Sequence, residues 1–95
     1  MEDIYPYDNF DIKRRANIGD RVKFFDEERN KSYQIILVSN KKSNPNDGLI
    51  SIYSYLGSSI FRLSENDNFE LYIFGEKRKY KIKNISHEKT INNKR

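Results

Sequence analysis

Few side chains in this sequence could carry out catalysis or hold a metal ion. His87 is the single histidine and cysteine is absent, so the chain offers neither the ligands of a zinc site nor a thiol nucleophile. The run Asp26-Glu27-Glu28 could supply oxygen ligands to magnesium, but its polar surroundings favour a solvated hairpin turn. No phosphate-binding glycine loop or nucleophile elbow is present. We predict a non-enzymatic protein with no catalytic residue, metal site or cofactor, in which His87 is solvated.

Positive charge gathers at the C-terminal end of the chain. Residues 75–95 hold eight lysines and arginines against two glutamates, a net charge of +6, whereas residues 1–74 have a net charge of −2. With the basic stripe Arg78, Lys79, Lys81 and Lys83, this asymmetry can attract an acidic partner, or it can simply reflect a solvated strand face followed by a soluble tail. The alternative is a nucleic-acid-binding module, in which these lysines contact phosphates and nearby aromatic rings stack on bases.

Two tyrosines flank a serine that is suited to begin a helix. The Ser54 hydroxyl can accept a hydrogen bond from a free amide two or three residues later, as helix N-caps do. Tyr53 and Tyr55 cannot both point inward from such a junction, so we expect at least one to be exposed. Exposed tyrosine is typical of binding surfaces, and half-buried packing at the sheet edge is the alternative.

The elements that position these residues follow from the hydrophobic pattern. Alternation predicts strands at 20–25, 31–39, 49–53, 69–74 and 78–85, with one short helix from Ser54 to about residue 63. This is an α+β fold, a mostly antiparallel sheet of about five strands with one helix against it. Both faces of strand 31–39 are apolar, so we predict that it is central. The predicted core is Tyr33, Ile35, Leu37, Ile52, Ile60, Leu71 and Ile82.

A family resemblance is clearest in residues 48–57, which read GLISIYSYLG. The segment resembles the C-terminal domain of bacterial GreA/GreB transcript-cleavage factors, in which a glycine precedes Ile-Ser-(Ile/Val) and Ser-Pro-Leu-Gly opens a short helix. Further matches follow in the family's order at 18–22, 33–38, 66–69 and 80–85. The resemblance covers roughly residues 18–86 and implies an FKBP-like fold. Fold alone does not imply prolyl isomerase activity, which we do not expect.

The resemblance also implies a partner. In Gre factors the region around the Ser-Pro turn helps to dock the domain on RNA polymerase, which would assign partner binding to Tyr53, Ser54, Tyr55, Leu56 and Gly57. Three departures stand out: Tyr55 replaces the proline, Arg62 replaces a glycine late in the helix, and the N-terminal coiled-coil hairpin is missing. That hairpin carries acids to the catalytic magnesium, so we expect polymerase binding without stimulation of transcript cleavage.

Domain boundaries complete the prediction. Residues 1–17 form an N-terminal extension, 18–86 the Gre C-terminal-like domain and 87–95 a polar tail. No signal peptide or apolar run of roughly 20 residues is present, so a cytoplasmic bacterial protein without membrane contact is expected. Self-pairing of an exposed edge strand would give a homodimer.

Overall fold

The computed structural model describes residues 14–87, and this part of the chain forms five strands and one α-helix. The strands are β1 (Asp20–Asp26), β2 (Lys31–Val38), β3 (Leu49–Ser51), β4 (Asn68–Ile73) and β5 (Glu76–His87). The helix is α2 (Tyr55–Ile60), and two single 3-10 turns, η2 (Asn40–Lys42) and η3 (Pro45–Asp47), connect β2 to β3. The predicted α+β fold, with about five strands and one short helix, is therefore confirmed.

The strands form one mixed sheet in the order β3-β2-β1-β5-β4. All neighbours are antiparallel except β2 and β3, which are parallel. Strand β1 is the middle strand and β2 lies between β3 and β1, so the prediction that β2 is central and covered on both faces holds only for its second half. β3 pairs only with Ile36 to Val38, which leaves the first half of β2 at an edge of the sheet. An apolar pattern on both faces of β2 did not reveal this because it says nothing about the length of the neighbouring strand.

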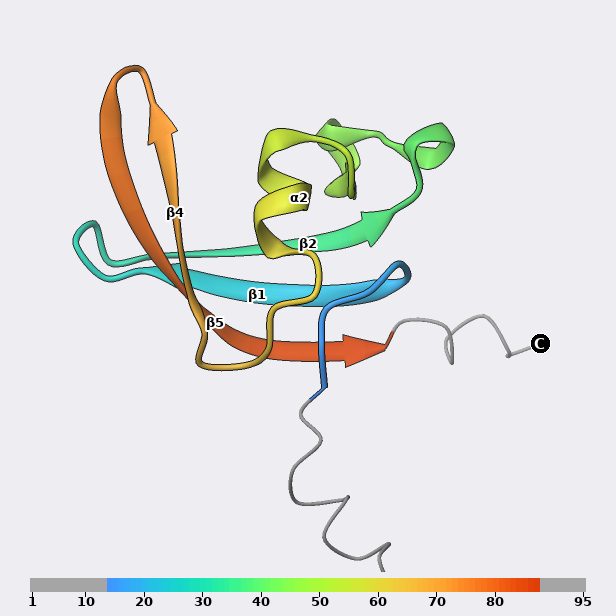
Figure 1. The fold of residues 1–95 in the computed structure, drawn as a ribbon, viewed down its shortest axis with the longest axis horizontal. Coiled ribbons are helices and arrows are strands. Elements are labelled where there is room, and N and C mark those ends of the chain that lie inside the picture. Colours follow the sequence, from blue (N-terminus) through green and yellow to red (C-terminus); the bar gives the residue numbers. More distant parts are fainter. Residues whose placement is uncertain (1–13, 88–95) are drawn as a thin grey trace, which may run out of the picture.

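The sheet curls, and α2 lies in its concave side (Figure 1). In the figure, the β4–β5 hairpin rises at one side of the helix while β2 and β1 run beneath it. Alternate side chains of the strands meet the helix and form the core, which consists of Ala16, Val22, Phe24, Ile35, Leu37, Ile60, Phe69, Leu71, Tyr80, Ile82 and Ile85. Burial of this apolar surface is the main stabilising contribution to so small a domain.

Most of the predicted core residues are buried, and two are not. Ile52 is half-buried and packs against the core cluster. Tyr33 is 37% exposed, which contradicts its assignment to the core. Its ring stacks on Phe24 with centroids 5.3 Å apart, but it lies in the half of β2 that β3 does not reach. One side of the ring therefore stays open to solvent.

An irregularity in β5 sets which of its side chains face outward. Phe24 pairs with Ile82, but Lys23 pairs with Asn84, so one extra residue is inserted in β5. Such a β-bulge interrupts the two-residue alternation. As a result Lys83 and Asn84 are both exposed, while Ile82 and Ile85 are both buried although they are three residues apart.

Two buried carboxylates correct the expectations for the polar residues. The Asp26 side chain is fully buried and accepts hydrogen bonds from the Arg29 backbone N–H at 3.1 Å and from the Arg29 guanidinium at 3.3 Å. The hairpin turn is therefore not simply solvated. His87, the last residue of β5, is exposed as predicted, but its Nδ1 also lies 2.7 Å from Oδ1 of the buried Asp20 at the start of β1.

Three other predictions meet the structure only in part. Residues 1–13 and 88–95, which include most of the predicted extension and tail, lie outside the described residues. No helix within 14–87 is long and apolar enough to cross a membrane. The outer strands are β3 and β4, and a homodimer formed by edge pairing stays a prediction.

Candidate partner-binding site

The junction between β3 and α2 is held by a compact set of hydrogen bonds. Ser54 is the N-cap of α2, and its Oγ accepts from the Gly57 backbone N–H at 3.0 Å, as predicted. The same hydroxyl donates to the Ser51 carbonyl oxygen at 2.7 Å. The Ser51 hydroxyl in turn accepts from the Tyr53 N–H at 2.9 Å. These bonds fix the backbone on both sides of Tyr53 and so determine where the two flanking tyrosines point.

Gly57 is required here because of space, not because of its backbone angles. A Cβ atom at this position would lie 1.9 Å from the Ser51 carbonyl oxygen and 2.8 Å from the Ser51 carbonyl carbon. Both values are far below a van der Waals contact, so any side chain would push α2 away from β3. The glycine allows the first turn of the helix to lie directly against the end of the strand.

The two tyrosines face solvent. Tyr53 is 74% exposed and Tyr55 is 57% exposed, which confirms that at least one of them is available at the surface. Tyr55 is not loose, because its hydroxyl accepts a hydrogen bond from the Tyr72 backbone N–H on β4 at 2.8 Å. Leu56 is half-buried and packs against the core. The predicted five-residue site thus divides into two outward tyrosines and three residues that position them.

Two further aromatic side chains lie exposed on the β4–β5 hairpin and were not singled out from the sequence. Tyr72 is 58% exposed and Phe74 is fully exposed. Phe74 and Gly75 form the two-residue turn, with φ angles of 53° and 79°. The alternation of 69–74 was the available signal, since it places Tyr72 opposite the buried Phe69 and Leu71.

Late in the helix, the structure explains why a glycine is expected where this chain has arginine. Arg62 follows the last turn of α2 with a φ of 74°, in the left-handed region that glycine adopts at little cost. Its backbone N–H donates to the Ala16 carbonyl oxygen at 2.7 Å, which fixes that conformation. Arginine in place of the expected glycine therefore retains the left-handed backbone conformation at this position, at the cost of conformational strain in Arg62.

The predicted basic stripe does not stay together. Lys79 and Lys83 are exposed and Lys81 is half-buried on the sheet face away from α2. Arg78 alternates with them on the other face, where its Nη2 lies 3.4 Å from the Glu76 carboxylate. The stripe is therefore three lysines, and it lies on a different face from the α2 side where Tyr53 and Tyr55 are held.

At the β1–β2 hairpin the buried Asp26 pairs with the partly exposed Arg29. Burial raises the pKa of Asp26, but hydrogen bonds and charge from Arg29 outweigh it and bring the pKa below its ordinary value. Arg29 also reaches across to β5, with its Nη2 3.2 Å from the Glu76 carboxylate. Within residues 14–87, no three histidine, cysteine or acidic side chains are grouped as a metal site would require.

Comparison with known proteins identifies the relatives of this domain. The family model "Transcription elongation factor, GreA/GreB, C-term" matches residues 12–87. Transcription elongation factor GreA of Sulfurovum sp. (strain NBC37-1) is 31% identical over 74 residues, which are 78% of this chain and 46% of that protein. The chain thus spans about half the length of the curated relative it matches.

Solved structures agree on the fold. A GreA/GreB elongation factor from Nitrosomonas europaea superposes with a TM-score of 0.68 at 22% identity, over 76% of this chain and 60% of that one. Gfh1 of Thermus aquaticus superposes with a TM-score of 0.73 at 18% identity, over 80% of this chain and 50% of that one. Together with the match over 12–87, these findings show that the chain belongs to the GreA/GreB transcription elongation factor family, through the C-terminal domain of that family.

Proposed function

We propose that this 95-residue chain is a non-enzymatic transcription accessory protein that binds RNA polymerase through Tyr53 and Tyr55. The observation that carries the proposal is that Tyr53 and Tyr55 are 74% and 57% exposed on a β3–α2 junction whose backbone is held by hydrogen bonds. Tyrosine presents a large contact area at a low cost in side-chain entropy, and such residues often dominate interface energetics. Ser54, Leu56 and Gly57 contribute by holding the two rings in place.

Hydrogen bonds behind the two tyrosines hold them in place, which favours a binding role for these exposed rings. Ser54 Oγ bonds both to Gly57 and to Ser51, and the Tyr55 hydroxyl is bonded to the β4 backbone. A surface that is ordered before binding loses less conformational entropy when a partner docks. Family membership supplies the partner class, because the relatives are transcription elongation factors. The bacterial cytoplasm is the compartment that such a partner implies.

We further propose that the chain does not itself stimulate cleavage of the transcript. The region shared with GreA corresponds to 46% of that protein and to its C-terminal domain. A competitor that docks without cleaving should lower GreA-stimulated cleavage by a backtracked polymerase in proportion to its occupancy. Cleavage stimulated by the purified chain, surviving controls for contaminating Gre factor, would contradict this part of the proposal.

The partner itself is tested by capture from the cells in which the protein occurs. The tagged chain is recovered with and without nuclease treatment, and retained proteins are compared with those of a Tyr53→Ala/Tyr55→Ala variant. Recovery of polymerase subunits that survives nuclease supports the proposal. Loss of polymerase after nuclease would show that nucleic acid bridges the two.

A further inference from the structure

The sheet face away from α2 collects lysines from two neighbouring strands. Lys23 of β1 joins Lys79, Lys81 and Lys83 of β5, and we refer to these four residues as the basic face. They alternate with buried side chains such as Val22, Phe24 and Tyr80, so their direction follows from the strands themselves. The bulge after Ile82 adds no lysine to the set, since Lys83 already follows the alternation of Lys79 and Lys81; it turns Asn84 outward beside Lys83.

These charges are not neutralised from within the domain. In the described part of the chain, no carboxylate lies within 4.0 Å of any of the four ammonium groups. Lys77, by contrast, is 3.7 Å from the Glu70 carboxylate and is left out of the basic face for that reason. Four unpaired cations on adjacent strands produce a local positive potential that an anionic chain can neutralise.

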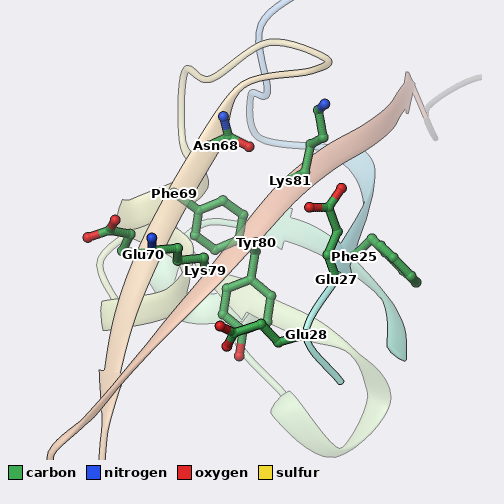
Figure 2. Close-up of a pocket in the computed structure, with 9 residues that line it drawn as sticks. All are labelled: Phe25, Glu27, Glu28, Asn68, Phe69, Glu70, Lys79, Tyr80 and Lys81. Carbon is green, nitrogen blue, oxygen red and sulfur yellow. The ribbon is translucent and has the colours of Figure 1, made fainter. Parts of the chain in front are cut away.

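Lysines of the basic face line two surface hollows. One, of about 470 Å³, is lined by Phe25, Lys79 and Lys81 (Figure 2). Three glutamates also line it, Glu27 and Glu28 of the hairpin and Glu70 of β4. The other, of about 400 Å³, is lined by residues that include Lys23, Gln34 and Lys83. Phe25 connects the two, since it lines the first hollow and its ring centroid lies 5.6 Å from the Lys83 Nζ of the second.

We propose that the basic face binds single-stranded nucleic acid, with its phosphates on Lys81, Lys83 and Lys23. Unpaired lysines along a groove with an accessible aromatic ring are the combination that holds single strands without sequence preference. Phe25 is half-buried and presents an apolar surface beside Lys81 and Lys83. Glu27, Glu28 and Glu70 repel phosphate in the first hollow, so the path runs from Lys81 away from it toward Lys23. This site is separate from Tyr53 and Tyr55 and does not depend on the proposed polymerase contact.

The test is a fluorescence-anisotropy titration of the full chain with labelled oligo(U) RNA and oligo(dT) DNA of about 12 nucleotides. At about 50 mM salt we expect dissociation constants of roughly 1–100 µM, weakening with a log–log salt slope near −2 for three phosphate contacts on a single strand. Equal affinity for the two oligonucleotides supports a phosphate site common to both. Tighter binding to RNA supports the same site with RNA as its occupant.

Matched variants make the result specific. Lys81→Gln/Lys83→Gln should weaken binding about 10-fold or more and make the salt slope shallower by about 1.4. Lys41→Gln/Lys42→Gln removes the same net charge from the exposed turn η2 and should change affinity less than about 2-fold. Glu27→Gln/Glu28→Gln should tighten binding. Urea unfolding of each variant confirms that the fold is unchanged.

Three outcomes would overturn the inference. One is no detectable binding of either oligonucleotide by the wild-type chain at about 100 µM and low salt, where even non-specific contacts are measurable. Another is an equal loss from both lysine pairs, which would reduce the effect to net charge. The third is a loss of polymerase binding, but not of oligonucleotide binding, in Lys81→Gln/Lys83→Gln, which would assign the face to a protein partner. The third result would leave the tyrosine site untouched, so the two proposals fail separately.

Discussion

Gly57 lies so close to the Ser51 carbonyl that a Cβ atom on it would be 1.9 Å from the carbonyl oxygen. The contact joins the first turn of α2 to the end of β3, and the Ser54 hydroxyl bridges the same two residues with hydrogen bonds of 2.7 Å and 3.0 Å. The Ser-x-Leu-Gly part of the sequence is thus a device for close packing. Its consequence for function is the fixed position of the tyrosines on either side of Ser54.

Gly57→Ala is therefore expected to destabilise the domain strongly. The new methyl group would meet backbone atoms, which cannot move aside as a side chain can, so we expect a loss of about 3 kcal/mol or more. Urea unfolding followed by circular dichroism measures it. Ser58→Ala is the matched control, because Ser58 is an exposed neighbour in the same helix and should change stability by less than about 0.5 kcal/mol. Similar stabilities for Gly57→Ala and the control would show that α2 does not lie this close to β3.

The ion pair between the buried Asp26 and the partly exposed Arg29 predicts a pH dependence of stability. Burial raises the pKa of Asp26, and the bonds from Arg29 lower it by more, so the folded-state pKa lies below the unfolded value. A depressed carboxyl pKa adds stability at neutral pH, which is lost as the pH falls below about 4 toward the folded-state value. Asp26→Asn should therefore lower the urea midpoint at pH about 7, and the gap from wild type should narrow at pH about 3.

The exposed neighbour Glu27 supplies the control for this pair. Glu27→Gln removes a carboxylate from the same hairpin but not from the interior, so its urea midpoint should follow wild type at both pH values. A constant gap between Asp26→Asn and wild type across the pH range would mean that Asp26 does not titrate as a stabilising carboxylate.

Arg62 predicts a substitution that relieves strain. Its φ of 74° is a conformation in which a side chain costs roughly 1–2 kcal/mol relative to glycine. Arg62→Ala and Arg62→Gly remove the same exposed guanidinium, so the difference between the two isolates the backbone. We expect the glycine variant to be about 1 kcal/mol more stable than the alanine variant in thermal or urea unfolding. An alanine variant as stable as the glycine variant would contradict the left-handed backbone at this position.

Much of the fold could be predicted because hydrophobic alternation directly records which strand face is buried. Leu71 and Ile82 are buried where the pattern placed them, and Ser54 caps α2 with the expected bond. The exposed first half of β2 was not predicted because strand coverage depends on pairing between distant segments, and β3 is only three residues long. Tyr33 is partly exposed for the same reason, because it lies in the first half of β2, with which β3 does not pair.

The polar features were harder to foresee because they depend on contacts that are remote in sequence or on backbone irregularity. His87 meets Asp20 across 67 positions of sequence. Lys23 becomes part of the basic face only because β1 and β5 are neighbours. The sequence placed Asp26 in a solvated acidic run with Glu27 and Glu28. In the structure only Asp26 of these three is buried, and it forms an ion pair with Arg29. The two tyrosines could be anticipated, since one serine cap fixes the junction that carries both.

Docking of this domain on RNA polymerase through Tyr53 and Tyr55 is tested most directly by an equilibrium titration against core polymerase. Wild type is compared with Tyr53→Ala/Tyr55→Ala, with Phe74→Ala as a matched loss of an exposed aromatic ring, and with Lys79→Glu/Lys81→Glu. We expect the tyrosine pair to lose more than about 1 kcal/mol per ring, roughly 30-fold or more in affinity together, at unchanged folding stability. Phe74→Ala should bind like wild type, and the lysine pair should mainly change the association rate and its salt dependence. Absence of wild-type binding at micromolar concentrations, or equal losses from Tyr53→Ala/Tyr55→Ala and Phe74→Ala, would contradict the account.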